Sequence, residues 1–554
     1  MLSLQVAPAN PSLSAGSSLQ FSATGTYSDG TIQDVTSSVL WSTDSPAVAS
    51  ISSVGVASAL VAGTTNVIAT YGSVTGTTSL AVTAPVLVSL SITPGTYLLP
   101  IAASVQLHAL GTYSDGSMQE ITASATWSSS SGAATVSSGG LVTAVSAGAA
   151  TITATAGGLT ATTAITSGTA IPASYFGMHI QNVSNWPSAN IGALAKGIGT
   201  SWNYMEPSPG VYKWALLDGY VNAALSRNID VVHTFYGVPQ WAASATANCQ
   251  TPATTVQCSG PPANPQDLYD YVTQVVTRYV GRIKYYELWN EPNNTKSWKR
   301  TVAAMATQSQ AVYNIIKSID PNALVITPGA ATGADNPTQS GWMRMYLLDG
   351  GASFADVSSW HAYPKVFPTN TCPQTLDCAG SLLVSQAAAM TSVLNSNGMA
   401  GKPVFVTEGG WGQDVTLPDF TQEAAYVSRW HILLASSGVT RAYWYAWGGT
   451  NWGTMFDPGI SIRPSGTAYE QLENWLTGAA VTPCSVGLDG TWTCSIGRGN
   501  GYQALIVWNS SGTASFPGTA GYIQYRDLSG NITTVNGPVT IGTQPIILEN
   551  MISH

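Results

Sequence analysis

Two apolar stretches of this 554-residue chain each end at a glutamate. The first, at residues 285–292, reads YYELWNEP and places Glu291 before a proline. The second, at residues 403–411, reads PVFVTEGGW and places Glu408 before two glycines. Both stretches have the composition of buried strands, so each would hold its glutamate rigidly at a strand end. Two carboxyl groups held in this way can cleave a glycosidic bond, because one protonates the leaving oxygen while the other attacks the sugar carbon.

Each glutamate also has a simpler interpretation. Glu291 could belong to an ordinary polar turn after a strand, and Glu408 could cap a helix, although the two glycines that follow would weaken a helix there. Two further carboxylates compete for a catalytic role. Glu287 lies on the same strand face as Glu291 and is expected deeper along that strand. Glu206, in the segment WNYMEP, ends another strand-like region.

A second group of side chains is suited to binding a sugar. Amide, imidazole and phenol groups exchange hydrogen bonds with hydroxyls, and the flat face of a tryptophan suits a sugar ring. A lone histidine is more often structural, and most of the 18 tryptophans are expected to fill cores. The candidates are Asn290, His361, Tyr363, His179, Trp241, Trp411, Trp444, Trp447 and Trp452.

Strand-like and helical stretches alternate from about residue 170 to residue 478. This alternation predicts a (β/α)8 barrel, whose active site lies at the C-terminal ends of the strands, where both glutamates are placed. The predicted strands include 176–179, 230–235, 283–289, 323–327, 357–361, 403–407 and 442–445. The predicted helices are 266–280, 302–318, 381–398, 421–437 and 467–477.

The segments on either side of the barrel have the character of β domains. The segment GTYSDG at 25–30 recurs at 111–116, and Trp41 recurs as Trp127 at the same offset. Short alternating runs of Val, Thr, Ala and Ser between these marks predict two β-sandwiches. Strand-like runs return after the barrel and predict a small third sandwich; they are 504–508, 522–526 and 545–548. The expected domains are 1–84, 85–168, 169–478 and 479–554.

Composition excludes several classes of protein. Charged residues make up only 8% of the chain, against about 25% in an ordinary soluble domain, while hydrophobic residues make up 44%. Disorder combines low hydrophobicity with high charge, so this chain is folded. The net charge of −9 and the lack of a Lys/Arg cluster exclude the electrostatic signature of nucleic-acid binding. We expect no membrane span, because no apolar run is long enough. The chain opens directly on strand-like sequence, so we expect a secreted protein whose signal peptide has been removed.

The six cysteines fall into three close pairs, which favours local disulfides and an oxidising compartment. Zinc binding is the weaker alternative, because the spacings are wider than in a zinc knuckle and no histidine lies nearby. The pairs are Cys249–Cys258, Cys372–Cys378 and Cys484–Cys494.

The two N-terminal repeats resemble bacterial Ig-like domains of group 2, which typically act as spacers or surface attachments. Residues 175–478 resemble clan A glycoside hydrolases, most closely families 39 and 5. The segments that carry this resemblance are FGMH at 176–179, WNYMEP at 202–207, GVYKW at 210–214, PQWA at 239–242, YYELWNEPN at 285–293, HAY at 361–363 and TEG at 407–409.

The resemblance implies a double displacement that retains anomeric configuration and requires neither a metal nor an organic cofactor. Glu291 would be the acid/base and Glu408 the nucleophile, with their carboxyl groups about 5–5.5 Å apart. One feature differs from the family pattern. Many relatives carry an arginine on strand two near the nucleophile, whereas residues 197–202 read GIGTSW, so Lys196 or another donor would have to substitute.

We therefore expect a secreted, monomeric bacterial enzyme that hydrolyses β-glycosidic bonds in a plant or microbial polysaccharide. The sequence leaves open which polysaccharide and linkage are cleaved, and whether the action is endo or exo. The alternatives are a noncatalytic carbohydrate-binding or cell-surface adhesion protein and a transglycosylase. The Ig-like repeats could also bind cell-surface glycans.

Overall fold

The computed structural model divides into two compact units, Met1–Ser167 with Gly499–Gly501, and Gly168–Arg498 with Tyr502–His554. The expected fold class is confirmed: two β-sandwich Ig-like domains, a (β/α)8 barrel and a C-terminal antiparallel β domain. The domain boundaries 1–84, 85–168, 169–478 and 479–554 stay a prediction. The structure describes residues 1–187, 191–195, 199–245, 247, 249–250, 257–331, 339–364, 376–412, 417, 419–448, 453–457, 461–518 and 521–551.

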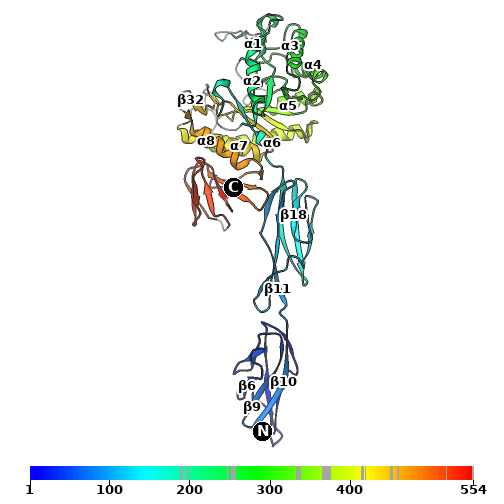
Figure 1. Ribbon diagram of the computed structural model, residues 1–554, viewed down its shortest axis with the longest axis vertical. Helices are drawn as coiled ribbons and strands as arrows, with labels where there is room; N and C mark the ends of the chain where they lie inside the picture. The colour runs from blue at the N-terminus through cyan, green and yellow to red at the C-terminus, as the bar shows by residue number, and fades with distance from the viewer. Residues whose placement is uncertain are drawn as a thin grey trace. The chain divides into compact units, whose positions relative to one another are not determined.

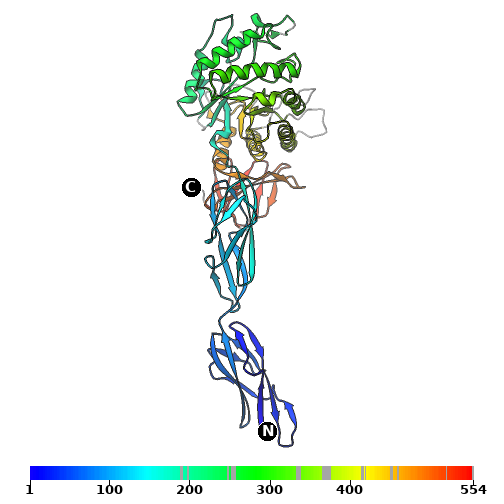
Figure 2. The ribbon, with the colours of Figure 1, turned by 90° about the vertical axis from the view of Figure 1, so that its right-hand side faces the viewer.

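The first unit contains two β-sandwiches (Figure 2). Their strands pair in the same order. The sheets of the first are β1-β4-β5, β2-β10-β9-β6 and β3-β8-β7. Their strands are β1 Ser3–Ala7, β2 Ser12–Ser14, β3 Ser18–Gln20, β4 Ser22–Thr26, β5 Ile32–Asp34, β6 Leu40–Thr43, β7 Ala49–Ile51, β8 Val56–Ala59, β9 Gly63–Tyr71 and β10 Val74–Thr83. The sheets of the second are β11-β14-β15, β12-β20-β19-β16 and β13-β18-β17. Their strands are β11 Leu87–Thr93, β12 Tyr97–Pro100, β13 Ser104–Gln106, β14 His108–Tyr113, β15 Met118–Glu120, β16 Thr126–Ser129, β17 Ala134–Val136, β18 Leu141–Ala144, β19 Gly148–Ala156 and β20 Leu159–Gly168.

The two sandwiches also share individual side-chain contacts. The indole of Trp41 donates to the Thr36 carbonyl at 2.9 Å, and that of Trp127 donates to the Thr122 carbonyl at 3.0 Å. Each ring thereby satisfies its one polar atom while packing against the core of its sandwich. The sequence repeat therefore reflects two copies of one structural unit.

Eight parallel strands form the barrel of the second unit, in the order β28-β27-β23-β22-β21-β31-β30-β29. Parallel bridges from Ile326 to Val357 and from Ala330 to Trp360 join the two end strands and close the sheet on itself. In chain order, and called strands one to eight of the barrel below, they are β21 Phe176–His179, β22 Ala193–Ala195, β23 Asp230–Thr234, β27 Tyr285–Glu287, β28 Leu324–Ile326, β29 Ser358–Ala362, β30 Val404–Gly409 and β31 Arg441–Trp444. Short strands also lie in the loops, at β24 Val238–Pro239, β25 Cys249–Gln250, β26 Gln257–Cys258, β32 Phe456–Asp457 and β33 Ser461–Ile462.

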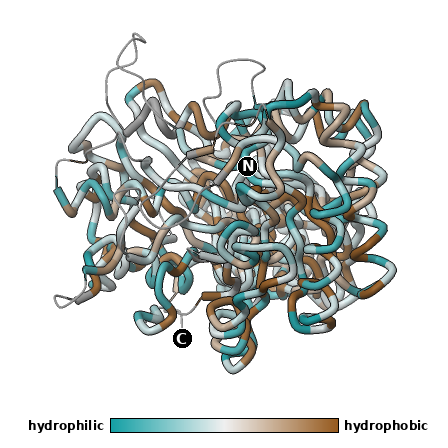
Figure 3. The backbone as a smooth tube through the Cα atoms, turned by 90° about the horizontal axis from the view of Figure 1, so that it is seen from above, coloured by the Kyte–Doolittle hydropathy of each residue, from teal (hydrophilic) through white to brown (hydrophobic). Residues whose placement is uncertain are grey.

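Helices cover the outside of the barrel (Figure 1). Helix α3 shows why they form: Asn264 caps its first turn, Pro265 occupies its first position, and its buried residues recur at helical spacing. Hydrophobic and hydrophilic stretches accordingly alternate along the chain (Figure 3). The helices are α1 Trp202–Met205, α2 Ala215–Leu225, α3 Pro265–Arg278, α4 Val302–Ile319, α5 Gln339–Leu348, α6 Leu376–Ser396, α7 Phe420–Ser436 and α8 Pro464–Leu476, with 3-10 turns η1 Ala173–Tyr175, η2 Val183–Asn185, η3 Gln240–Ala242 and η4 Gly351–Phe354. Among the described residues, no helix is both long and apolar enough to cross a membrane.

The C-terminal domain is antiparallel and packs against the barrel. Helix α7 is buried along almost its whole length, and its Arg429 donates to the Thr543 carbonyl and lies over the Trp508 ring. A second apolar cluster lies between the large sheet and the β38–β41 pair, which gives a small sandwich. The strands are β34 Ala480–Val481, β35 Ser485–Val486, β36 Thr491–Gly497, β37 Gln503–Asn509, β38 Ala514–Phe516, β39 Gln524–Arg526, β40 Ile532–Thr534, β41 Val539–Ile541 and β42 Ile546–Glu549.

Candidate active site

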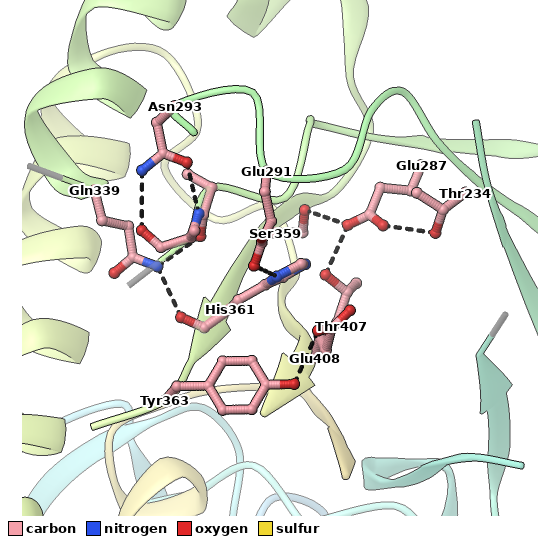
Figure 4. A network of polar contacts seen from close by, with 12 residues as sticks. Thr234, Glu287, Glu291, Asn293, Gln339, Ser359, His361, Tyr363, Thr407 and Glu408 are labelled. Atoms are coloured by element: carbon pink, nitrogen blue, oxygen red, sulfur yellow. Dashed lines mark hydrogen bonds and ion pairs between the residues drawn. The ribbon is translucent and has the colours of Figure 1, made fainter. Parts of the chain in front are cut away.

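The interior of the barrel changes from apolar to polar along the strands. Inward-facing Val232, Tyr285 and Phe405 belong to one buried apolar cluster. Two residues further along the same strands, Thr234, Glu287 and Thr407 form a polar layer, because successive inward positions in a strand are two residues apart. Beyond this layer lie the strand ends that carry both candidate glutamates (Figure 4).

Glu287 lies in the polar layer and not at the strand end. Its buried carboxylate accepts hydrogen bonds from Thr234 Oγ1 at 2.7 Å and Thr407 Oγ1 at 2.6 Å, and Ser359 Oγ lies 2.8 Å away. These hydroxyls belong to strands three, seven and six of the barrel. The expectation that Glu287 sits deeper than Glu291 therefore describes its position correctly.

Glu291 follows strand four in an unusual backbone conformation. Its φ is +48°, a left-handed conformation that non-glycine residues rarely adopt and that commonly marks functional sites. Its amide donates to the Gly329 carbonyl at 2.8 Å, and Asn290 forms a parallel bridge with Gly329. The carboxylate is about one-fifth exposed, and its Oε1 lies 3.0 Å from His361 Nδ1. Strand five therefore fixes the backbone of Glu291, and strand six fixes its side chain.

Glu408 reaches the pocket through an irregularity in strand seven. The pairing of strands six and seven goes from Trp360–Val406 to His361–Glu408, which leaves Thr407 as an extra, bulged residue. A bulge re-aims the side chains that follow it, so Thr407 and Glu408 can both serve the barrel interior. The Glu408 Oε1 atom accepts a 2.8 Å hydrogen bond from the Tyr363 phenol.

His179 stabilises this bulge. Its Nε2 lies 2.8 Å from the Thr407 carbonyl, and the ring is buried. A buried carbonyl accepts a hydrogen bond, so the imidazole donates from Nε2. The sequence suggested that His179 binds a sugar, and the structure places it against the backbone that carries the nucleophile candidate.

The two glutamates lie close together. One oxygen of Glu291, one oxygen of Glu408 and one ring nitrogen of His361 all lie within 4.8 Å of one another. This separation suits direct attack by one carboxylate and leaves less room than the gap of about 6.5–9.5 Å that an interposed water needs. Within the described chain this is the one cluster of His, Cys, Asp and Glu atoms close enough for a metal ion. We interpret it as a hydrogen-bonded acid pair, because His361 and Tyr363 each contact one of the carboxylates.

Both supporting side chains have shifted pKa values. Burial by itself lowers the pKa of His361, but the negative charges of Glu408, Glu291 and Glu287 raise it above its ordinary value. Burial, and then the charge of Glu408, hold the pKa of the Tyr363 phenol well above its ordinary range. Tyr363 therefore stays protonated and remains a donor to Glu408 at every pH near neutrality.

Three of the tryptophans predicted to bind a sugar do not have the exposure that stacking requires. Trp444 has no exposed surface, and its indole donates to the Gly453 carbonyl at 2.6 Å. Trp411 is 5% exposed and contacts the Trp444 ring edge-on, while Trp447 is 2% exposed and stacks on Phe456. These three tryptophans fill the core, so their assignment as sugar-stacking groups is corrected here.

The sequence interpretation missed Tyr445. Tyr443 faces the barrel interior, so Trp444 faces the helices and Tyr445 faces inward again, beyond the end of strand eight. Tyr445 keeps partly exposed surface, and its ring packs against that of His179 with 4.9 Å between the ring centroids. Strict counting of alternate positions along 443–445 would have identified it.

The other candidates lie away from the acid pair. Glu206 follows helix α1 and not a strand, and its carboxylate accepts from the Trp202 indole at 2.7 Å and the Gly210 amide at 2.8 Å. Trp241 donates to the Glu206 carbonyl at 3.0 Å and lines a pocket of about 620 Å³ with Glu206, Tyr212 and helix α3. Neither Glu291 nor Glu408 lines this pocket. Lys196 and Trp452 lie outside the described residues.

Two of the expected disulfides are present, Cys249–Cys258 and Cys484–Cys494. The first joins the short strands β25 and β26, and the second joins the approach to strand β35 with strand β36. Cys372 and the side chain of Cys378 lie outside the described residues, so their pairing stays a prediction.

Comparisons with known proteins match the N-terminal repeats and the barrel to two different families. Residues 2–82 and 87–167 match the family described as bacterial Ig-like domain (group 2). Residues 197–450 match the family described as cellulase (glycosyl hydrolase family 5). The curated ice-binding protein 1 of Shewanella frigidimarina (strain NCIMB 400) is 44% identical over 129 residues, which are 23% of this chain and 14% of that protein.

The solved structures that match this chain include a glycoside hydrolase and a β-xylosidase. A family 39 glycoside hydrolase from Bacteroides cellulosilyticus WH2 has a TM-score of 0.52 at 17% identity, covering 83% of this chain and 99% of that one. A monomeric β-xylosidase from Caulobacter crescentus CB15 has a TM-score of 0.49 at 15% identity, covering 69% and 97%. At these identities the first likeness establishes a shared fold.

Proposed function

We propose that Glu291 and Glu408 are the catalytic pair of this chain, which is a glycoside hydrolase with a clan A, family 5 domain at residues 197–450 and two group 2 bacterial Ig-like domains. The family retains anomeric configuration and acts on polysaccharides. The observation that carries the assignment is the approach of the two carboxylates, whose oxygens lie within 4.8 Å of each other and of His361. Paired carboxyl groups at this separation support a double displacement.

In the first step, Glu408 attacks the anomeric carbon while Glu291 protonates the glycosidic oxygen. Tyr363 donates to Oε1 of Glu408 and thereby orients the attacking carboxylate. His361 lies against Oε1 of Glu291, so the acidic proton is delivered from Oε2. The first step forms a bond between the sugar and Glu408 and releases the leaving group with the proton of Glu291.

In the second step, Glu291 accepts a proton from water, and the oxygen of that water attacks the anomeric carbon. The bond to Glu408 breaks, the sugar leaves with its original configuration, and Glu291 is protonated again for the next cycle. His361 stays in contact with Glu291 through both steps and stabilises its charged form. Tyr445, at the end of strand eight, is an aromatic side chain with exposed surface suited to contact a sugar ring.

We further propose that the enzyme cleaves β-glycosidic bonds of a plant or microbial polysaccharide outside the cytoplasm. The two disulfides favour an extracytoplasmic compartment, since such bonds persist in oxidising environments. The Ig-like domains are proposed as spacers or as attachments to cell-surface glycans.

Product analysis on a polysaccharide panel tests the function directly. Xylan, β-glucan, mannan and a bacterial exopolysaccharide would be incubated with the parent protein and with Glu408→Ala, and reducing ends would be counted. We expect release from at least one polymer, loss of at least about 1,000-fold in the variant, and retained configuration in the first product by proton NMR. Activity of Glu408→Ala near the parent level, or an inverted product, would contradict the proposal.

A further inference from the structure

Glu287 is a buried carboxylate that takes no part in the double displacement described above. It is 1% exposed, so it has no direct route to substrate. Burying a carboxylate costs free energy unless hydrogen bonds compensate it, and here three hydroxyl groups contact the carboxylate. The residues that contact Glu287 indicate a role for it.

The hydroxyls around Glu287 belong to the strands that present the catalytic groups. Thr407 directly precedes Glu408 in the bulge of strand seven. Ser359 lies two residues before His361 on strand six, and its hydroxyl proton is shared between Glu287 and the Thr327 carbonyl, 2.9 Å away. Glu287 itself lies four residues before Glu291 on strand four. One carboxylate thus connects the supports of both catalytic glutamates and of His361.

Glu287 also lies beside the imidazole of His361. A Cβ built on Gly329 would lie 2.7 Å from His361 Nε2 and 2.8 Å from Glu287 Oε1, so both atoms flank the same glycine. Only a residue without a side chain lets them approach in this way. Three carboxylates act on His361: Glu291 after strand four, Glu408 on strand seven, and Glu287 in the polar layer. Tyr363, which donates to Glu408, follows the same strand as His361.

We propose that Glu287 is a positioning residue, which fixes the bulge that presents Glu408 and places a negative charge beneath the His361–Glu291 pair. The proposal rests on the catalytic roles assigned above. Without this charge, His361 would lose its proton at a lower pH, because a nearby negative charge favours the protonated imidazole. Without the acceptor oxygens of Glu287, the Thr407 hydroxyl would lose its hydrogen-bond partner, and the bulge would be held less firmly.

The test compares Glu287→Gln with Thr407→Val. Glutamine keeps the shape and removes the charge, whereas valine removes one hydroxyl and leaves the charge. The substrate is 4-nitrophenyl β-cellobioside or β-xylobioside, whichever the parent hydrolyses. For Glu287→Gln we expect kcat to fall about 10- to 100-fold with KM within about twofold, because misplacement by about 1 Å has such an effect. The basic limb of its kcat/KM profile should move to lower pH. For Thr407→Val we expect a smaller loss of kcat and a basic limb at the parent pH.

Several outcomes would overturn the proposal. If Glu287→Gln has the pH profile of the parent, the negative charge of Glu287 has no role. If Glu287→Gln has the kcat of the parent, Glu287 does not position the catalytic groups. Azide should speed the reaction of Glu291→Ala and not that of Glu287→Gln, and rescue of the latter would make Glu287 a catalytic acid/base. If Glu287→Gln does not fold by circular dichroism, Gly329→Ala takes its place, since its methyl group must separate Glu287 from His361. A parent kcat and pH profile in that variant would equally overturn the proposal.

The same series separates the two proposals. Activity in both Glu291→Ala and Glu408→Ala would refute the catalytic assignment whatever Glu287→Gln shows. Loss of activity in those two variants, with parent values in Glu287→Gln, would refute the positioning role alone.

Discussion

The phenol of Tyr363 donates a 2.8 Å hydrogen bond to Oε1 of Glu408 from the end of the neighbouring strand. Strands six and seven are paired directly, so the donor and the carboxylate are held by adjacent parts of one sheet. The elevated pKa of the phenol means that its proton is always available for this bond. The geometry makes Tyr363 the main fixed donor to the nucleophile among the contacts described above.

Removing that hydroxyl should lower the rate of attack. Tyr363→Phe is expected to reduce kcat about 10- to 100-fold, because a hydrogen bond to a charged group contributes about 1.5–3 kcal/mol. Steady-state kinetics on an aryl glycoside measures the loss. The matched control is Tyr220→Phe, which removes a phenol that donates to the Ile180 and Gln181 carbonyls. Equal kinetics in the two variants would contradict the role of Tyr363.

His361 should matter most when the leaving group needs protonation. His361→Asn removes the 3.0 Å contact with Glu291, so the acid is less well positioned. We expect a loss of about 100-fold on polysaccharide and a smaller loss on aryl glycosides with good leaving groups. A series of aryl glycosides with leaving groups of different pKa measures the difference.

His108→Asn is the control for this substitution, because His108 lies in the second Ig-like domain and contacts Glu120. It should behave as the parent on every substrate. A loss in His361→Asn that is the same for good and poor leaving groups would remove the link between His361 and the acid.

Much of the barrel could be predicted from the sequence, because its strands are apolar runs and its helices repeat at helical spacing. The predicted helix 266–280 is observed as Pro265–Arg278, and 302–318 as Val302–Ile319. Strand two was expected at 197–202 but lies at Ala193–Ala195, a short segment that lacks branched or aromatic residues apart from Leu194. Helix α2 was missed, since Gly219 and Asn222 weaken its helical signal.

The candidate site could be predicted only in part, for a different reason. Glu291 and Glu408 follow from strand ends, but the bulge at Thr407 depends on pairing between strands that are distant in sequence. The three hydroxyls around Glu287 come from three other strands, so no local pattern connects them. Trp444 was chosen for its residue type, whereas strand alternation decides that Tyr445 faces inward.

Replacing Tyr445 or its neighbour Trp444 by alanine should have different effects, the first mainly on activity and the second mainly on stability. Tyr445→Ala should lower kcat/KM about 10-fold or more with little change in thermal stability, since its ring is partly exposed and contacts His179. Trp444→Ala should destabilise the fold by about 3–5 kcal/mol, because the ring is wholly buried. Thermal unfolding and kinetics on both variants decide between them. A stable but inactive Trp444→Ala would restore the original assignment.

Glu473 on helix α8 should make stability depend on pH. Burial, and then the charge of Glu470 one turn away, raise the pKa of Glu473 from 4.5 to about 7. The folded state therefore binds this proton more tightly than the unfolded state. The resulting stabilisation is complete below pH 4.5 and is lost as the pH rises through 7.

Glu473→Gln removes the ionisation, so the variant should gain stability relative to the parent mainly at high pH. We expect a gain of about 1 kcal/mol at pH 8, after discounting for the solvent that screens a partly exposed group, and little gain at pH 4.5. Thermal unfolding at the two pH values measures the difference, which should be about 2 °C for a unit of this size. Glu470→Gln should give a smaller shift of the same sign, because the neighbouring charge is the lesser of the two causes. A gain that is equal at both pH values would show that packing, and not ionisation, accounts for the effect.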